Sequence, residues 1–194
     1  MRPSLSVCVF CGSSPGQDQV FRQEAARLGR MLADMGVGLV YGGGDLGLMG
    51  ILARSCLDAG GYVTGIIPEH LQESEKTYLE VSELILVSSM HERKKAMFER
   101  ADLFCILPGG LGTLDETFEI LTWKQIRLHD KPVFFLDVNG FWQPVLAAIS
   151  QAITLGFSAP SVAKLYQVLP GPDALPAALA ALAAPAFASR PGEF

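Results

Sequence analysis

The stretch that most constrains the fold is an apolar run at residues 103–107 that passes through closely spaced glycines into a helical pattern. The run Leu-Phe-Cys-Ile-Leu has the continuous hydrophobic character of a strand buried in a parallel sheet. Gly109, Gly110 and Gly112 therefore stand where a strand turns into a helix. Glycine lets the backbone approach an anion closely, and the N–H groups of a first helical turn point towards it. The stretch predicts a phosphate-type site.

The same alternation of strand and helix runs through the chain. Apolar runs predict strands at residues 6–11, 38–41, 62–67, 84–87, 103–107, 133–136 and 166–169. Helical periodicity predicts helices at 17–35, from the glycines at 42–47 through 59, at 89–101, 113–129 and 141–155. We therefore expect an α/β fold, a Rossmann-like doubly wound parallel sheet of about seven strands with helices on both faces.

Composition indicates one domain. A chain of 194 residues that is 49% hydrophobic can bury a full core, which we assign to residues 1–170. The Ala- and Pro-rich residues 171–194 offer little area to bury, and we expect a mobile tail with at most a short helix. A net charge of -5 argues against a nucleic-acid surface. No apolar stretch approaches the roughly 20 residues of a membrane span, and we expect a cytoplasmic protein.

The cysteines and histidines do not predict a metal site. Cys8 and Cys11 form a C-x-x-C pattern, but their odd separation sends the two side chains to opposite faces of a strand. The segment that begins at His91 resembles H-E-x-x-H but has Lys95 in place of the second histidine. We expect neither a metal nor a cofactor.

Two glycine-rich segments each allow a simpler interpretation. Thr113 and Glu116 stand three residues apart before a helical run, so Glu116 is either a ligand-binding group or only the second half of a capping box. Residues 42–47 satisfy G-x-G-x-x-G, with Glu69 about twenty residues further on, which is typical of dinucleotide binding. That motif follows the second strand here rather than the first, and glycines can also serve tight turns alone.

A basic helix start is the third candidate feature. Ser89 and Glu92 form a capping box that begins a helix. This places His91, Arg93, Lys94 and Lys95 in or near its first turn. Cations at the positive end of a helix dipole are unfavourable by about 0.3–1 kcal/mol each, so their position favours an anionic ligand over simple solvation.

Three motifs together resemble those of one family. They are Tyr-Gly-Gly-Gly-x-x-Gly-Leu-Met-Gly at 41–50, Met-His-Glu-Arg-Lys at 90–94 and Pro-Gly-Gly-Leu-Gly-Thr-Leu-Asp-Glu at 108–116. The combination is similar to the Lonely Guy family of cytokinin-activating phosphoribohydrolases, often mislabelled lysine decarboxylases. The resemblance implies hydrolysis of the N-glycosidic bond of a nucleoside 5′-monophosphate such as AMP or N6-isopentenyl-AMP, and a homodimer whose interface contributes to the site.

The resemblance also implies site residues. Arg93 and Glu116 match the family's catalytic pair. The candidate substrate-binding residues are Ser13, Gly43, Gly44, Glu75, Met90, Lys94, Gly109, Gly110, Leu111, Gly112, Thr113, Leu114, Asp115 and Thr122. The rival hypothesis is a non-catalytic nucleotide or cofactor carrier with the same fold, because a salt bridge between Arg93 and Glu116 would preserve both residues without chemistry.

Overall fold

The computed structural model describes residues 3–72, 76–78 and 80–183. Within these residues, seven strands form one parallel sheet: β1 (Ser6–Phe10), β2 (Gly38–Tyr41), β3 (Val63–Pro68), β4 (Glu83–Val87), β5 (Leu103–Ile106), β6 (Val133–Leu136) and β7 (Gln167–Leu169). In the same part of the chain, six α-helices connect or follow them: α1 (Gln19–Asp34), α2 (Gly47–Asp58), α3 (Met90–Arg100), α4 (Leu111–Gln125), α5 (Gln143–Thr154) and α6 (Leu175–Ala183). The predicted doubly wound α/β fold is confirmed.

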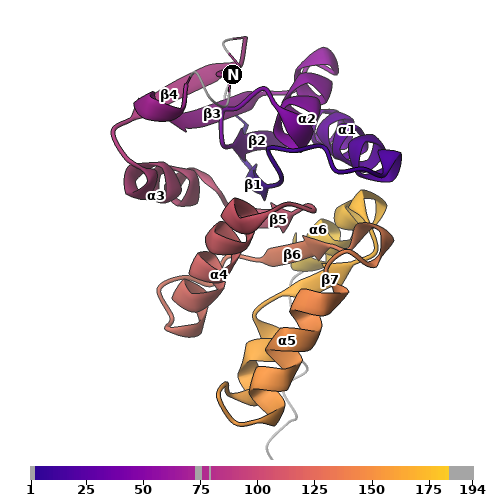
Figure 1. Ribbon diagram of the computed structural model, residues 1–194. Coiled ribbons are helices and arrows are strands. Elements are labelled where there is room, and N and C mark those ends of the chain that lie inside the picture. The colour runs from indigo at the N-terminus through magenta and orange to yellow at the C-terminus, as the bar shows by residue number, and fades with distance from the viewer. Residues whose placement is uncertain (1–2, 73–75, 79, 184–194) are drawn as a thin grey trace, which may run out of the picture.

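The sheet has the strand order β4-β3-β2-β1-β5-β6-β7. The chain builds outward from β1 to β4, then returns to the other side of β1 with β5. The strand order therefore reverses between β1 and β5, and in open parallel sheets ligands bind at such a point, beyond the carboxyl ends of the strands. Figure 1 shows the segments that follow β1 and β5 meeting in the middle of the molecule.

Helices cover both faces of the sheet. On one face, core side chains of α1 and α2, such as Leu28 and Leu52, pack with Leu175 at the start of α6. On the other face, Met97 of α3 and Ile120 of α4 pack with Trp142, just before α5. Among the described residues, none of the helices has the length and apolar character needed to cross a membrane.

The segment after Pro170 differs from expectation. Leu175 is fully buried, and α6 begins at this residue and packs Ala178 and Leu179 against the same core. The short helix that the sequence allowed is therefore present, and it packs on the core, which the sequence did not indicate. Its small residues allow the helix to lie close to the core, and one leucine supplies the buried anchor.

Helix α4 begins and ends earlier than predicted. Gly110, in an extended conformation, is its N-cap, and the helix starts at Leu111 rather than at residue 113. It ends at Gln125 because Arg127 adopts a left-handed conformation with φ 64°. Periodicity could not show either boundary, because glycine and leucine at the start and apolar residues at the end continue a helical pattern.

Candidate active site

A cavity of about 220 Å³ lies at the point where the strand order reverses. The turn after β1 and the turn after β5 contact each other directly, because the Gly12 N–H donates to the Pro108 carbonyl at 3.0 Å. The Leu48 N–H at the start of α2 donates to the Gly12 carbonyl at 3.0 Å. Three chain segments thus fix the base of the cavity.

The cavity brings most of the predicted site residues together. Arg93 of α3 and Glu116 of α4 both line it. The other predicted residues in its wall are Ser13, Met90, Gly110, Leu111, Gly112, Thr113 and Asp115. A basic and an acidic side chain therefore border the same space as the glycine-rich start of α4.

Glu116 does not cap α4. The N-cap is Gly110, and it provides no side-chain hydrogen bond, so the predicted capping box of Thr113 and Glu116 is wrong. Thr113 lies inside the helix, where its carbonyl accepts a hydrogen bond from the Thr117 hydroxyl at 2.6 Å. Glu116 lies on the second turn, partly buried, and faces the cavity. A role for this carboxylate as a helix cap alone is therefore excluded.

Internal packing explains only one of the three glycines at the helix start. A methyl group added at Gly109 would collide with the Thr113 side chain, so packing requires glycine there. A methyl group at Gly110 or Gly112 would meet no protein atom within 4 Å, and neither residue has a positive φ. Glycine is also about 1 kcal/mol less favourable than alanine inside a helix. Glycine at these two positions is what close approach of a ligand to the backbone requires.

Arg93 is held against the glycine-rich turn after β2. Its side chain is only 4% exposed, and its Nη2 donates to the Gly42 carbonyl at 2.9 Å. A side chain at Gly42 would collide with this guanidinium, so glycine here makes room for the arginine. Burial of a cation beside a partly open cavity suits an anionic or electron-rich ligand.

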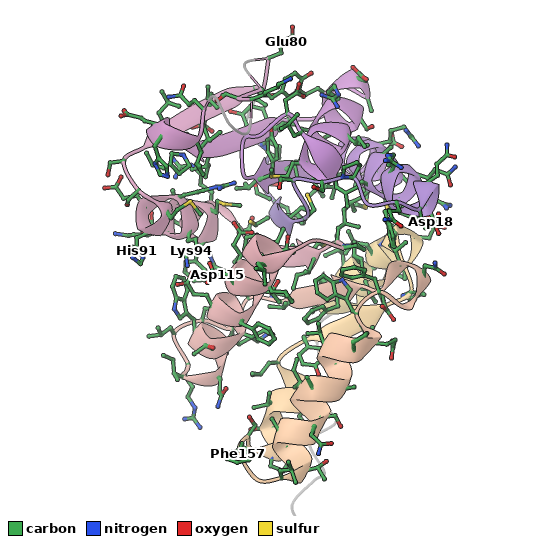
Figure 2. All side chains as sticks on the ribbon, in the orientation of Figure 1. Asp18, Glu80, His91, Lys94, Asp115 and Phe157 are labelled. Atoms are coloured by element: carbon green, nitrogen blue, oxygen red, sulfur yellow. The ribbon has the colours of Figure 1, made fainter. Side chains whose placement is uncertain are left out.

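The other basic residues at the start of α3 do not line the cavity. The predicted Ser89 cap is confirmed, since its hydroxyl accepts from the Glu92 N–H at 3.2 Å. Lys94 joins α3 to α4 through Asp115 at 3.2 Å and Glu119 at 3.0 Å. Figure 2 shows Lys94 and Asp115 facing each other between these helices. Burial alone would lower the pKa of Lys94, but the hydrogen bonds that its ammonium donates to the two carboxylates outweigh burial, and the pKa is raised.

His91 and Lys95 point to solvent rather than to the cavity. His91 is exposed on the first turn of α3, and Lys95 is exposed and lies 3.8 Å from the Glu99 carboxylate. The prediction that the whole basic cluster faces a ligand is therefore wrong for these two residues. A helix turn distributes four neighbouring side chains around its axis, so they cannot all face one cavity.

Cys11 lines the cavity and was not predicted as a site residue. Burial raises the pKa of its thiol, the negative charge of Glu116 raises it further, and Arg93 opposes the shift. Cys11 therefore remains a neutral thiol, unsuited to nucleophilic attack at neutral pH. Its position directly after β1, beside Gly12, was the available signal. Met49 and Leu71 complete the apolar part of the wall. Met49 lies in the motif at 41–50, whereas no motif marked Leu71.

Several predicted residues lie outside this cavity. Gly109 lines a neighbouring cavity of about 250 Å³, which shares Gly12, Ser13 and Gly110 with the first. Leu114 packs against the core cluster that also contains Met97 and Ile120, on the face of the sheet covered by α3 and α4. Glu75 lies outside the described residues.

Gly43 and Gly44 belong to the turn that holds Arg93. The Gly43 carbonyl accepts from the Tyr78 N–H at 3.0 Å, and Gly44 forms an isolated antiparallel bridge with Thr77. Gly43 has φ +77°, a conformation that favours glycine. The two residues serve the backbone in this structure, and neither lines the cavity.

Thr122 lies two turns further along α4, in a different place. It is exposed, its hydroxyl donates to the Phe118 carbonyl at 2.7 Å, and it lines an apolar groove of about 280 Å³ between α4 and α5. The structure therefore does not bring Thr122 to the cavity of its own subunit.

Known proteins resemble this chain in sequence and fold. The family described as "Possible lysine decarboxylase" matches residues 49–179. The probable cytokinin riboside 5′-monophosphate phosphoribohydrolase LOGL5 of Oryza sativa subsp. japonica is 43% identical over 164 residues, which cover 84% of this chain and 67% of that protein. The cytokinin riboside 5′-monophosphate phosphoribohydrolase LOG2 of Arabidopsis thaliana is 42% identical and is covered to 81%.

A solved structure shows the same fold at lower identity. The Moco carrier protein of Chlamydomonas reinhardtii superimposes with a TM-score of 0.69, at 23% identity, over 94% of this chain and 98% of that chain. The similarity in sequence to the plant proteins is much stronger and extends over most of the chain. This chain therefore belongs to the family of cytokinin riboside 5′-monophosphate phosphoribohydrolases, which is also described as the possible lysine decarboxylase family.

Proposed function

We propose that this protein hydrolyses the N-glycosidic bond of adenosine 5′-monophosphates, including N6-substituted ones, to free base and ribose 5-phosphate. The observation that carries the proposal is that Arg93 and Glu116 border one cavity with Gly110 and Gly112, whose side-chain positions are open. The relatives' names state this activity for proteins 42–43% identical to the chain.

The reaction breaks the bond between C1′ of the ribose and N9 of the base. A water oxygen bonds to C1′, the base leaves with the bonding electron pair, and the proton from water ends on the base. The transition state resembles an oxocarbenium ion, so a fixed carboxylate beside the ribose lowers its energy. We assign this role, and the orientation of the water, to Glu116. Arg93 supplies positive charge for the departing base or the phosphate.

The 5′-phosphate is assigned to the start of α4. Gly110 and Gly112 leave space for the phosphate next to the first N–H groups of the helix, and the helix dipole favours its charge. A nucleoside without phosphate leaves these donors unmatched, so adenosine should be a very poor substrate beside AMP. Comparable turnover of both compounds would remove the phosphate from this position.

Free base released from AMP and from N6-isopentenyl-AMP, measured by chromatography with the purified protein, tests the activity. The alternative of a nucleotide or cofactor carrier predicts binding of the nucleotide without release of base. The Glu116→Gln variant is the matched control, since it keeps the shape of the site and loses the charge.

A second copy of the chain fits the groove between α4 and α5. No residue of α5 itself is buried, although the helix is largely apolar. Phe118 is exposed and lines the groove, and Leu155 and Phe157, which follow α5, are exposed as well. Figure 2 shows Phe157 at the end of α5 furthest from the sheet. We infer a homodimer through this face, in which Thr122 approaches the cavity of the other subunit. The cytoplasmic location expected from the sequence stays a prediction.

A further inference from the structure

One turn supports two walls of the cavity. This glycine turn, residues 42–45, follows β2. On one side, the Gly42 carbonyl accepts from Nη2 of Arg93 at 2.9 Å. On the other side, the turn pairs with residues 76–78, which we name the strap. A displacement of the turn would therefore move the guanidinium in the cavity and the chain held by the strap.

Two backbone hydrogen bonds join the strap to the glycine turn, and each segment donates one of them. The Asp45 N–H donates to the Lys76 carbonyl at 2.8 Å, and the Tyr78 N–H donates to the Gly43 carbonyl at 3.0 Å. The strap also reaches the cavity wall, because the Thr77 N–H donates to the Gln72 carbonyl at 3.0 Å. Gln72 directly follows Leu71, which lines the cavity.

Arg54 ties the turn and the strap to α2. Long helical side chains lean towards the helix N-terminus, and Arg54 reaches back in this way to Asp45. Its Nη1 forms a salt bridge with the Asp45 carboxylate and donates to the Asp45 carbonyl at 3.3 Å. The guanidinium also lies over the Tyr78 ring, 5.9 Å from its centroid. One side chain thus contacts both partners of the backbone pairing.

Arg54 itself does not line the cavity. It is 42% exposed and Asp45 is 34% exposed, and ion pairs in such positions contribute little to global stability. This ion pair contacts the glycine turn and the strap, which adjoin two walls of the cavity. We therefore expect its loss to change the shape of the cavity more than the stability of the protein.

We propose that Arg54 is a positioning residue for nucleotide binding. By holding the glycine turn against the strap, it fixes Arg93 on one wall of the cavity and Leu71 on the other. The inference rests on the proposed function, since it names a residue that sets the affinity of the same site. It assigns no contact between Arg54 and the substrate.

The test is the substitution Arg54→Met, which keeps the aliphatic stem and removes the charge. We expect KM for AMP to rise about tenfold while kcat changes by less than about threefold, because a displaced wall weakens binding of ground and transition states alike. Arg54→Lys keeps the charge beside Asp45 and should restore most of the affinity. Asp45→Asn combined with Arg54→Met should be no worse than the stronger single variant, as expected of residues that act through one contact.

Arg27→Met is the matched control. Arg27 is 50% exposed and pairs with Asp173 at 2.5 Å, on α1 and away from the cavity. It should lower the melting temperature as little as Arg54→Met does and leave KM unchanged. Equal KM for Arg54→Met and wild type, or equal changes of KM in the two methionine variants, would overturn the proposal.

The dissociation constant for AMP, measured by calorimetry, separates this inference from the proposed function. If the wild-type protein binds AMP without releasing base, the proposed function fails, and a tenfold weaker dissociation constant in Arg54→Met still supports the positioning role. If wild type does not bind AMP, both proposals fail. If wild type turns AMP over and Arg54→Met binds it equally well, only the positioning role fails.

Discussion

At the scale of single residues, the structure removes the capping role that the sequence pattern suggested for Glu116. Gly110 is the N-cap of α4, so the carboxylate on the second turn is not the second half of a capping box. Glu116 and Arg93 both line the cavity. The stability and the chemistry of this position can therefore be separated by one conservative change.

Glu116→Gln should leave the melting temperature nearly unchanged and lower turnover of AMP by about two orders of magnitude or more. Glutamine has almost the same shape but cannot supply the negative charge that an oxocarbenium-like state requires. Glu99→Gln, on the exposed side of α3, is the control and should retain full turnover. Near-normal turnover of Glu116→Gln would take the central residue from the proposed mechanism.

Gly112→Ala should keep or raise the melting temperature and raise KM for AMP about tenfold. The new methyl group meets no protein atom within 4 Å, and alanine is the better helix former, by up to about 1 kcal/mol. The same methyl group occupies the space assigned to the phosphate. Thermal unfolding and steady-state kinetics on one preparation measure both effects. An unchanged KM would contradict the phosphate assignment.

At the scale of elements, the link between α4 and β6 depends on a neutral histidine. His129 is buried, its Nδ1 accepts from the Lys131 N–H at 3.1 Å, and its Nε2 therefore donates to the Ile120 carbonyl at 2.9 Å. Burial lowers the pKa of His129, and the nearby cations Lys124 and Lys131 add to this against the opposing hydrogen bond to Ile120.

Stability should therefore fall as the pH falls below about 6.5. Below this value the unfolded chain binds a proton at His129 that the folded protein binds less readily, so the unfolded state is stabilised relative to the folded state. Urea unfolding of wild type and His129→Gln at about pH 7.5 and about pH 5.5 measures the effect while staying above the usual carboxylate range. The urea midpoint of wild type should fall more than that of the variant. Equal shifts would show that another group carries the pH dependence.

The elements were largely predictable because two signals agree in them. Apolar runs located the seven strands of the described residues to within one or two residues, as at Gly38–Tyr41, and most of these runs are bounded by glycine or proline. The start of α4 was missed because its cap is a glycine inside a ligand-type loop, which carries no side-chain signal. The burial of Leu175 was missed because its partners lie near the beginning of the chain, and local periodicity contains no information about contacts so distant.

At the scale of the whole molecule, the groove between α4 and α5 determines the predicted assembly. The protein should have the mass of a dimer in light scattering at micromolar concentration. Phe118→Lys places a charge in the groove and should give a monomer. Turnover should fall as well, because Thr122 then no longer approaches the cavity of another subunit. Phe118 is 42% exposed, and Leu86 on the edge strand β4 is 47% exposed. Leu86→Lys is therefore the control and should remain a dimer, whereas a monomeric, fully active wild type would refute the assembly.

The site was predictable at this scale only where it follows from the order of strands. Ser13 follows β1, Gly110 and Gly112 follow β5, and all three line one cavity at the reversal of the strand order. The positions of Leu71 and Arg54 relative to the cavity could not be predicted in this way. They depend on contacts between irregular segments, which have no repeating sequence pattern.

The position of Leu175 has a consequence for synthesis of the protein. This side chain lies in the same core cluster as Leu28 and Leu52, more than 100 residues earlier. A nascent chain emerging from the ribosome would therefore hold an incomplete apolar face on α1 and α2 until residue 175 had been translated and had left the ribosome. Chaperones that recognise exposed apolar surface have their longest opportunity on this face, and ribosome-stalled chains that stop before Leu175 should remain bound to them.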